Sequence, residues 1–401
     1  MDNYHVVRIA PVVNLTLRQE IAADPEYKGL SYDAYLDKIL AGNYNYSDVF
    51  AHEMRQLGNR VEEIVYDVEG LQKQWAKEND LELVDGEHWQ VKIVLEQLKK
   101  LNPDVVYIQS FSRVSPKAIE EIKDQLPNLK KIAVHSGFPN GHDVVTKDTI
   151  VFAGFPNIQK SFSELGCETH LIYHFWDERI LSRMKPIERE IPFSFIGTSG
   201  NGYGPGHKTR YWELLKLAHN TPLEGWIDDK DAFVDPESET NPFIDLPLKP
   251  QYYSDLQADY TMYPNPFAPL RYLMPKGRVH KPVYGDDYFQ TLHDSLITFQ
   301  RHTDAMYSEI GAMRVFQATG AGACLLTNDG DNMADLFERD TEVVTYSSLH
   351  ECIEKANYLA DNPEKAREIA KKGQARTLRS HTAKERYAEV HQHLLNALKR
   401  A

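Results

Sequence analysis

The chain has 401 residues, 42% of them hydrophobic and 11% aromatic, which is enough apolar material for two domains with cores of their own. Its formal net charge of −14 argues against nucleic acid as the main partner, because neutralising phosphate groups requires a basic face. No apolar run is long enough to span a membrane, and the first residues lack the pattern of a signal peptide, so we expect a soluble, cytoplasmic protein.

The cysteines point to the same location. Cys167, Cys324 and Cys352 lie far apart in the sequence and form no C-x-x-C pair. This spacing is typical of a reducing compartment and predicts no zinc site.

In the first half, short apolar runs alternate with amphipathic stretches, which predicts parallel strands separated by helices. Helices are predicted over Tyr46–Leu57 and Gln90–Leu101, because Gly58 and Asn102-Pro103 close them. The predicted strands are His5–Val13, Val61–Tyr66, Asp104–Ile108, Lys131–Val134, Ile150–Ala153 and Thr169–Tyr173. We therefore expect a doubly wound, Rossmann-like α/β domain over residues 1–180.

Residues 185–190 carry mixed charges and little periodicity, which is typical of a linker. A second domain with the same alternation follows over residues 190–383. The patterns Ser348-x-x-Glu351 and Asn362-Pro363 predict helix starts within it. Its predicted strands are Phe193–Gly197, Leu296–Phe299, Ala323–Thr327 and Val343–Tyr346.

Residues 228–287 are rich in proline, aspartate and tyrosine and poor in periodicity, so we interpret them as an insertion in the second domain. The tyrosines of the insertion can stack on a sugar, although packing of a long loop is their more ordinary role. They include Tyr252, Tyr253, Tyr260 and Tyr263. A last helix over residues 384–401 has an apolar face at helical spacing, which predicts that this face is buried. The face consists of Tyr387, Val390, Leu394, Leu395 and Leu398.

The most informative segment runs from Ser308 to Asp335. It predicts a polar loop, a helix, a glycine-rich turn, an apolar strand and an acidic loop that opens a further helix. In a doubly wound domain the loop before the helix lies at the carboxyl edge of the sheet, where ligands bind. The N–H groups of a helix N-terminus at that edge suit an anion such as a diphosphate.

Glu309 and Gln317, separated by seven residues and followed by a run of small residues, resemble the Glu-x7-Glu element of GT-B glycosyltransferases. From Ser295 onward the chain is more narrowly similar to the CgeB-like group and to the glycosyl transferases group 1 family. The matching features are Ala312-Met313-Arg314, Phe316-Gln317-Ala318, Leu325-Leu326-Thr327, Leu336-Phe337 and His381-Thr382.

This resemblance implies a fold of two Rossmann-like domains that face each other across a cleft. It also implies that the second domain holds a nucleotide diphosphate sugar as donor, and that the first domain holds the acceptor. The helix over residues 384–401 is expected to pack back on the first domain. Arg314 is expected to contact the donor.

Two residues depart from the family pattern. Ala312 stands where the family has asparagine, and Gln317 stands in place of the second glutamate. A carboxylate accepts hydrogen bonds from both hydroxyls of a ribose, whereas an amide offers one acceptor oxygen and an NH2 donor group. We still expect Gln317 to contact the ribose; the alternative is that it merely begins a helix. Glu309 is expected to face the donor sugar or the reaction centre, or to be an ordinary glutamate in a first helical turn.

A second element is the glycine-rich stretch from Phe195 to Arg210, which follows a strand and leads into a helix. Backbone amides of such a loop can approach a pyrophosphate while basic side chains neutralise it. The residues predicted to hold the diphosphate here are Gly197, Thr198, His207, Lys208 and Arg210. The alternative for Arg210 is a solvated surface arginine.

Two histidines are candidates for the general base of the reaction. His135 follows an apolar run at the carboxyl end of a predicted strand, and His302, with Asp304 nearby, holds the matching place in the second domain. A histidine titrates near neutrality and can accept the proton of an acceptor hydroxyl. The alternative for each is a loop histidine with satisfied hydrogen bonds.

The Asp329-Gly330-Asp331 triplet resembles the Asp-x-Asp by which GT-A glycosyltransferases hold a divalent metal. It precedes Asn332 and a predicted helix, so we interpret its polar residues as helix caps. We therefore expect neither a metal nor any other cofactor, because backbone amides and arginine can stabilise a departing diphosphate.

The sequence thus predicts a glycosyltransferase that moves a sugar from a nucleotide diphosphate donor, such as a UDP-sugar, to a carbohydrate or glycoconjugate acceptor. Surface polysaccharide or glycoconjugate assembly is the context that the resemblance implies. Two alternatives stay open: a nucleotide-sugar 2-epimerase of the same fold, and a non-catalytic sugar-nucleotide binding protein. The sequence does not indicate an oligomeric state.

Overall fold

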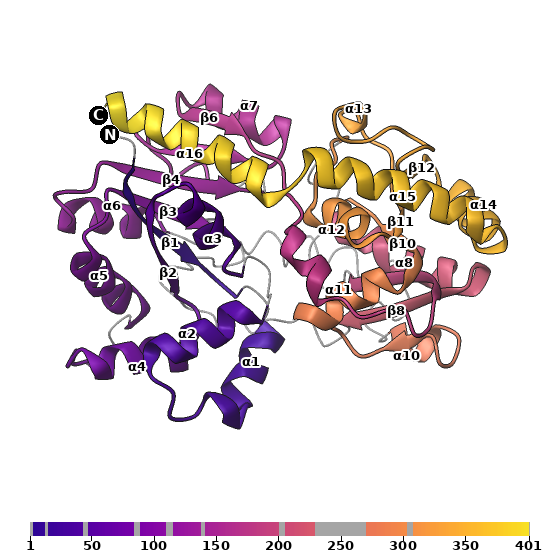
Figure 1. The fold of residues 1–401 in the computed structure, drawn as a ribbon, viewed down its shortest axis with the longest axis horizontal. Helices are drawn as coiled ribbons and strands as arrows, with labels where there is room; N and C mark the ends of the chain where they lie inside the picture. Colours follow the sequence, from indigo (N-terminus) through magenta and orange to yellow (C-terminus); the bar gives the residue numbers. More distant parts are fainter. Residues whose placement is uncertain are drawn as a thin grey trace. The chain divides into compact units, whose positions relative to one another are not determined.

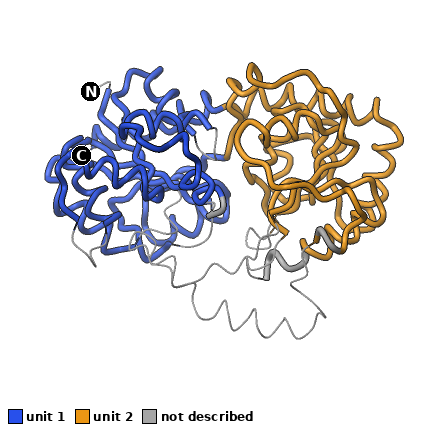
Figure 2. Tube along the Cα trace, turned by 90° about the horizontal axis from the view of Figure 1, so that it is seen from below, with its two compact units in different colours: residues 1–173, 240–246, 383–401 blue, residues 174–239, 247–382 orange. Residues whose placement is uncertain are grey.

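The computed structural model describes residues 3–12, 15–42, 47–83, 89–109, 115–137, 141–199, 205–228, 270–302 and 308–400. Of residues 15–16, 205–209 and 271–272 it describes the backbone alone. The chain divides into two compact units (Figures 1 and 2). Among the described residues, the first unit consists of residues 3–173 and 383–400, and the second of residues 174–228 and 270–382.

The first unit contains a six-stranded sheet in which all neighbours run parallel, in the order β2-β1-β3-β4-β5-β6. Its strands are β1 His5–Ala10, β2 Arg60–Val65, β3 Val105–Gln109, β4 Lys131–Ser136, β5 Ile150–Ala153 and β6 Glu168–Leu171. The central strands are buried on both faces, which explains why they read as short, almost continuous apolar runs. This confirms the predicted α/β sheet, with strand ends shifted by at most three residues.

Helices cover this sheet. They are α1 Leu15–Ala23, the 3-10 turn η1 Pro25–Tyr27, α2 Tyr32–Ala41, α3 Val49–Gln56, α4 Glu69–Glu78, α5 Trp89–Leu101, α6 Pro116–Gln125, α7 Pro156–Glu164 and, from the C-terminal segment, α16 Ala383–Arg400. Several begin where the sequence offers a cap: Ser31 and Ser115 each accept a hydrogen bond from the backbone N–H three residues later.

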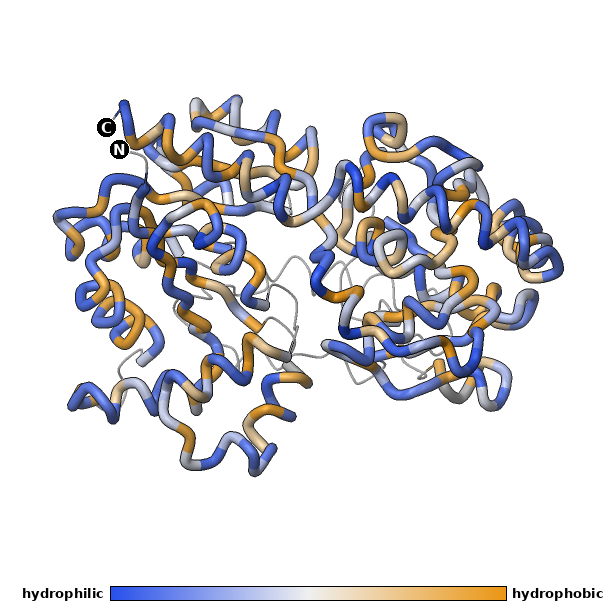
Figure 3. The backbone as a smooth tube through the Cα atoms, viewed as in Figure 1, coloured by the Kyte–Doolittle hydropathy of each residue, from blue (hydrophilic) through white to orange (hydrophobic). Residues whose placement is uncertain are grey.

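The C-terminal helix α16 packs against α3 of the first unit. Hydrophobic and hydrophilic residues alternate along its turns (Figure 3). The five apolar residues predicted to form a buried face are all buried: Tyr387, Val390, Leu394, Leu395 and Leu398. At its end, Arg400 donates to both carboxylate oxygens of Glu168 in β6, at 2.6 and 2.7 Å.

The second unit has its own six-stranded parallel sheet, in the order β12-β11-β10-β7-β8-β9. Its strands are β7 Ile191–Thr198, β8 Leu223–Asp228, β9 Val279–His280, β10 Ser295–Gln300, β11 Cys324–Asn328 and β12 Val344–Tyr346. The chain runs outward from β7 through β8 to β9, then returns to the other side of β7 for β10. The carboxyl ends of β7 and β10 therefore form the topological switch point, where doubly wound sheets bind ligands.

The helices of the second unit are η3 Glu178–Arg183, α8 Pro205–Asn220, α10 Leu270–Leu273, α11 Gly285–His293, α12 Met313–Ala321, α13 Met333–Leu336, α14 Leu349–Asp361 and α15 Pro363–Ser380. Strand β8 was not predicted. The predicted insertion over residues 228–287 is wrong at its end, because α10, β9 and the start of α11 are regular elements of this unit. Tyr252, Tyr253, Tyr260 and Tyr263 lie outside the described residues.

Both predicted helices begin where expected, but only one of them has a capping side chain. Ser348 caps α14 by accepting a hydrogen bond from the N–H of Glu351 at 3.2 Å. Asn362 is the N-cap of α15, but its side chain donates backward to the carbonyl of Tyr358 at 2.7 Å and does not cap the helix. Within the described part of the chain, no helix is long and apolar enough to cross a membrane.

Candidate functional site

The switch point of the second sheet gathers residues from three elements. Strand β7 ends with Gly197 and Thr198, and β10 leads directly into Arg301 and His302. The backbone N–H of His302 donates to the side chain of Asn328 at the end of β11, at 2.8 Å, which fixes the chain as it leaves β10. Residues from β7, β10 and β11 are thus held at one edge of the sheet.

Two features favour glycine at position 197: its backbone conformation and the side chain of Arg314 beside it. The φ of Gly197 is +148°, a conformation that L residues rarely adopt. A Cβ atom there would lie 3.2 Å from a terminal guanidinium nitrogen of Arg314. Arg314 lies in the first turn of α12, with its guanidinium carbon 5.5 Å from the centroid of the Phe195 ring. The Nε atom of Arg314 is buried and has no hydrogen-bond partner among the described residues.

Two further arginines converge on the same edge. Arg210, from α8, lies 3.5 Å from the hydroxyl of Thr198 and 3.5 Å from the carbonyl oxygen of Arg301. The guanidinium of Arg301 forms an ion pair at 2.6 Å with Glu213, one turn after Arg210 on α8. Arg301 also donates to the carbonyl of His302 at 3.0 Å. The edge therefore carries three guanidinium groups, of which Glu213 offsets one.

His302 lies beside these arginines with only 4% of its surface exposed. Neither ring nitrogen has a hydrogen-bond partner within the described ranges. Burial, together with the positive charges of Arg210 and Arg301, lowers the pKa of His302 to about 3. The expectation that this histidine titrates near neutrality is therefore wrong for the protein without ligand; its catalytic role stays a prediction. Asp304 lies outside the described residues.

Gln317 is the fifth residue of α12, so the interpretation that it merely begins a helix is wrong. It lies one turn after Arg314, on the same face of the helix. Its amide oxygen accepts a hydrogen bond from the hydroxyl of Tyr288 in α11, at 2.8 Å. Ala312 is the N-cap of α12 and supplies no side-chain cap, so the first N–H groups of this helix are not satisfied by a capping side chain.

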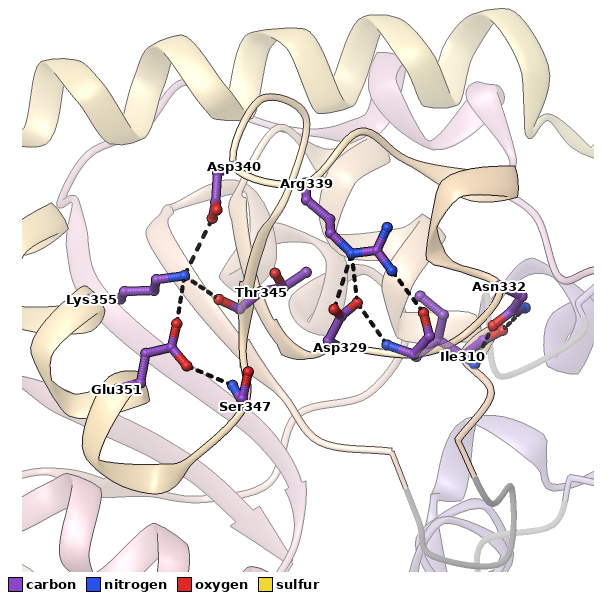
Figure 4. A network of polar contacts seen from close by, with 10 residues as sticks. Ile310, Asp329, Asn332, Arg339, Asp340, Thr345, Ser347, Glu351 and Lys355 are labelled. Carbon is purple, nitrogen blue, oxygen red and sulfur yellow. Dashed lines mark hydrogen bonds and ion pairs between the residues drawn. The ribbon is translucent and has the colours of Figure 1, made fainter.

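Glu309 is half-buried in the loop before α12. That loop is fixed on both sides of Glu309: the Asn332 side chain bonds the N–H and carbonyl of Ile310 at 2.8 and 2.7 Å (Figure 4), and Ser308 bonds the Asp331 carboxylate. These contacts hold Glu309 near the N-terminus of α12.

The same contacts correct the interpretation of the acidic triplet as helix caps. Asn332 precedes the short helix α13 but bonds Ile310 and makes no capping hydrogen bond. Asp329 forms a two-point contact with Arg339, at 2.9 and 3.0 Å (Figure 4). The residues of this acidic triplet therefore tie loops together. The absence of a metal from this protein stays a prediction.

Three candidates remain: His135, His207 and Lys208. His207 and Lys208 fall in the first turn of α8, where the structure describes the backbone alone. His135 lies in the first unit, buried near the carboxyl end of β4, in register with Gln109 of β3 and Phe152 of β5. Among the described side chains, the second unit thus brings together Thr198, Arg210, His302 and Arg314 beside Gly197, with Gln317 one turn away.

Sequence reasoning missed Arg301 and Tyr288. Arg301 follows directly on a buried strand, and that position was itself a signal, because it lies between strand β10 and the predicted candidate His302. Tyr288 left no signal: it falls at the boundary of the stretch interpreted as an insertion, and its contact with Gln317 joins two separate helices.

Comparison with known proteins supports this architecture. Residues 258–392 match a family model described as glycosyl transferase-like. A glycosyltransferase from Rickettsia africae has a similar structure, with a TM-score of 0.57, 10% identity and 100% of both chains covered. So has HepE from Anabaena in complex with UDP-glucose, with a TM-score of 0.52, 12% identity and coverage of 98% of this chain and 100% of that one.

The chain has the GT-B fold, and its residues 258–392 match the glycosyl transferase-like family model. A third GT-B-like match is a Listeria monocytogenes protein put forward as a UDP-N-acetylglucosamine 2-epimerase, with a TM-score of 0.50, 11% identity and coverage of 100% of this chain and 97% of that one. At these identities the structural matches establish the fold alone. No curated protein matches the sequence. In this GT-B chain Arg301, His302, Arg314 and Gln317 all lie within the matched segment.

Proposed function

We propose that this GT-B protein is a glycosyltransferase whose second unit binds a nucleoside diphosphate sugar, with UDP as the first nucleotide to test. The observation that carries the proposal is the convergence of Arg210, Arg301 and Arg314 on the switch point of the second sheet. A similarly folded protein, HepE, was crystallised with UDP-glucose. The proposed acceptor is a carbohydrate or glycoconjugate of surface polysaccharide assembly, bound by the first unit.

The electrostatics of this edge suit a diphosphate. Arginine presents a planar fork of donors that matches phosphate oxygens. Glu213 offsets one of the three guanidinium charges, so positive charge remains for an anion. The N-terminus of α12 adds N–H groups without a side-chain cap. These groups would stabilise the diphosphate that departs when the sugar is transferred.

In this proposal Gly197 allows close approach of the phosphates, with Thr198, His207 and Lys208 beside them. Gln317 contacts the ribose. His135, His302 and Glu309 are the candidates for proton transfer and sugar orientation. A bound diphosphate would place negative charge beside His302 and raise its pKa from about 3, which makes its protonation dependent on the ligand.

The proposal is tested by calorimetry and thermal shift with nucleoside diphosphates and their sugars. A ligand at 100 times its dissociation constant adds about 2.7 kcal/mol to the unfolding free energy. We expect Arg314→Ala and Arg210→Ala each to weaken UDP binding at least tenfold, because a charge-assisted hydrogen bond contributes about 1.5–3 kcal/mol. Arg367→Ala is the matched control, since Arg367 pairs with Glu190 just before β7 begins, at the opposite end of that strand. Wild-type protein that binds no nucleoside diphosphate would refute the proposal.

Product analysis separates this function from its alternatives. A transferase needs an acceptor, whereas a 2-epimerase converts the nucleotide sugar alone. The fold shared with the Listeria protein keeps the epimerase as the second candidate. Donor binding without turnover across a panel of acceptors would instead indicate a binding protein, the alternative to which Ala312 and Gln317 point.

A further inference from the structure

Tyr288 of α11 contacts the side-chain amide of Gln317. Its hydroxyl donates to the amide oxygen at 2.8 Å. The tyrosine ring packs edge-on against buried Phe289, with centroids 5.1 Å apart, which restricts its movement. A glutamine amide has one oxygen and one NH2 group, so engaging the oxygen leaves the two N–H donors for another partner.

The position of this pair places it beside the diphosphate edge. Gln317 lies one turn after Arg314, whose guanidinium borders Gly197 at the end of β7. Tyr284 is the N-cap residue of α11, four residues before Tyr288. The hydroxyl of Tyr284 donates at 3.2 Å to Asp228, which is in register with Thr198 across β8 and β7. The two tyrosines therefore join the end of β8 to α12, along one side of the switch point.

We propose that Tyr288 is a positioning residue that presents the NH2 group of Gln317 to the nucleotide. The NH2 group then donates a hydrogen bond to the oxygen of a ribose hydroxyl. The inference rests on the proposed function, because it assumes a nucleotide at this edge. A glutamate at this place would accept hydrogen bonds from the ribose. The glutamine held by Tyr288 donates instead, so this chain binds the ribose with the opposite hydrogen-bond polarity.

The test compares UDP with 2′-deoxy-UDP and 3′-deoxy-UDP by isothermal titration calorimetry. We expect the wild type to prefer UDP over one of the two analogues by about 2- to 12-fold, the range of a neutral hydrogen bond. In Tyr288→Phe the amide of Gln317 loses its fixed orientation. The ratio of the affinity for UDP to that for the deoxy analogue therefore falls toward 1, while the affinity for the deoxy analogue itself is retained. Tyr358→Phe, at an exposed tyrosine of α14, is the matched control and keeps the wild-type preference.

A second background distinguishes orientation from a general structural effect. Gln317→Glu has two equivalent carboxylate oxygens and therefore nothing for Tyr288 to orient. Adding Tyr288→Phe to Gln317→Glu should leave the preference for UDP unchanged, although the same change in the wild type abolishes it. A purely structural tyrosine would alter both backgrounds alike and would weaken all three ligands equally.

Three results would overturn the inference: a wild type without any preference for UDP over either analogue, a Tyr288→Phe variant that keeps the preference, or equal weakening of UDP and both analogues. Each leaves the proposed function standing, since UDP still binds. If the wild type binds no nucleoside diphosphate, the proposed function fails first and the inference fails with it.

Discussion

Gly197 leaves the end of β7 without a side chain beside Arg314. A side chain at this position would meet two penalties, one from its φ of +148° and one from Arg314 at 3.2 Å. The first penalty belongs to the backbone and the second to the proposed diphosphate site. A matched glycine elsewhere separates the two.

We predict that Gly197→Ala lowers the unfolding free energy by about 1–3 kcal/mol, because of backbone strain, and also weakens UDP binding by displacing Arg314. Gly277, with a φ of +83° and nothing within 4 Å of an added Cβ, is the control. Gly277→Ala should lose only about 1–2 kcal/mol of stability and keep its UDP affinity. Chemical denaturation and calorimetry measure both quantities. UDP affinity that is equal in Gly197→Ala and the wild type would contradict the assignment of this edge.

Individual residues also set what the sequence alone can predict here. Gly197, Thr198 and Arg210 could be placed at this edge because they stand in a glycine-rich turn and the helix after it, whereas Arg314 was expected there only from the resemblance. The pairing of Arg301 with Glu213 joins residues on separate elements, and no local pattern encodes it. The low pKa of His302 likewise depends on burial and on two arginines that only the folded chain brings near it.

At the scale of elements, the polar contacts of α16 with the rest of the first unit include His391 and His393. The Nδ1 atom of His391 lies 2.9 Å from the amide nitrogen of Asn59 and 3.2 Å from the hydroxyl of Tyr4, and it can accept from these donors only when unprotonated. His393 stacks on His170 of β6 with centroids 3.6 Å apart. Two stacked imidazoles resist a second positive charge.

We therefore predict that acid weakens the docking of α16. Burial lowers the pKa of His391, and burial together with His170 lowers that of His393, with Glu168 opposing. A histidine whose folded pKa lies below the unfolded value of about 6.5 stabilises the fold above that pH, and this contribution is lost as the pH falls below it. Solvent screening keeps the loss below about 1 kcal/mol per histidine.

Denaturation at pH 7 and pH 5 tests this prediction. His393→Gln should reduce the loss of unfolding free energy between the two pH values. His350→Gln, at a side chain that is 84% exposed on α14, should not. An acid sensitivity that is the same in both variants and the wild type would show that the stacked pair does not carry it.

Elements differ in how well the sequence predicts them, and the reason is burial. Strands β5 and β11 were predicted almost to the residue because they are continuous apolar runs. Strand β8 was missed because it carries Glu224, a buried carboxylate whose charge is satisfied by Arg189 and by His280 at 2.9 Å. In the sequence alone, a strand that carries such a charged residue resembles a loop, because the residues that pair with the charge are not evident.

At the scale of the whole molecule, the two units can respond separately to change. Leu394 of α16 is fully buried in the first unit, while the proposed nucleotide site lies in the second. We predict that Leu394→Ala lowers the stability of the first unit by about 2–5 kcal/mol and leaves UDP affinity unchanged. UDP should raise the melting temperature of the second unit. Two-domain chains commonly depart from two-state unfolding, so calorimetry can resolve both effects.

The control for this prediction is Leu378→Ala, because Leu378 of α15 is 39% exposed and belongs to the second unit. It should cost far less stability than Leu394→Ala. Loss of UDP affinity in Leu394→Ala would contradict the separation of the two units.

The return of α16 to the first unit also sets an order for folding on the ribosome. Residues 3–173 leave the exit tunnel before the second unit, but the helix that covers α3 and pairs with β6 is translated after the entire second unit. At ordinary elongation rates that interval lasts tens of seconds. The second unit can therefore reach its native state before the first unit. Until α16 is made, the apolar surface that it covers on the first unit stays exposed, and chaperones can bind there.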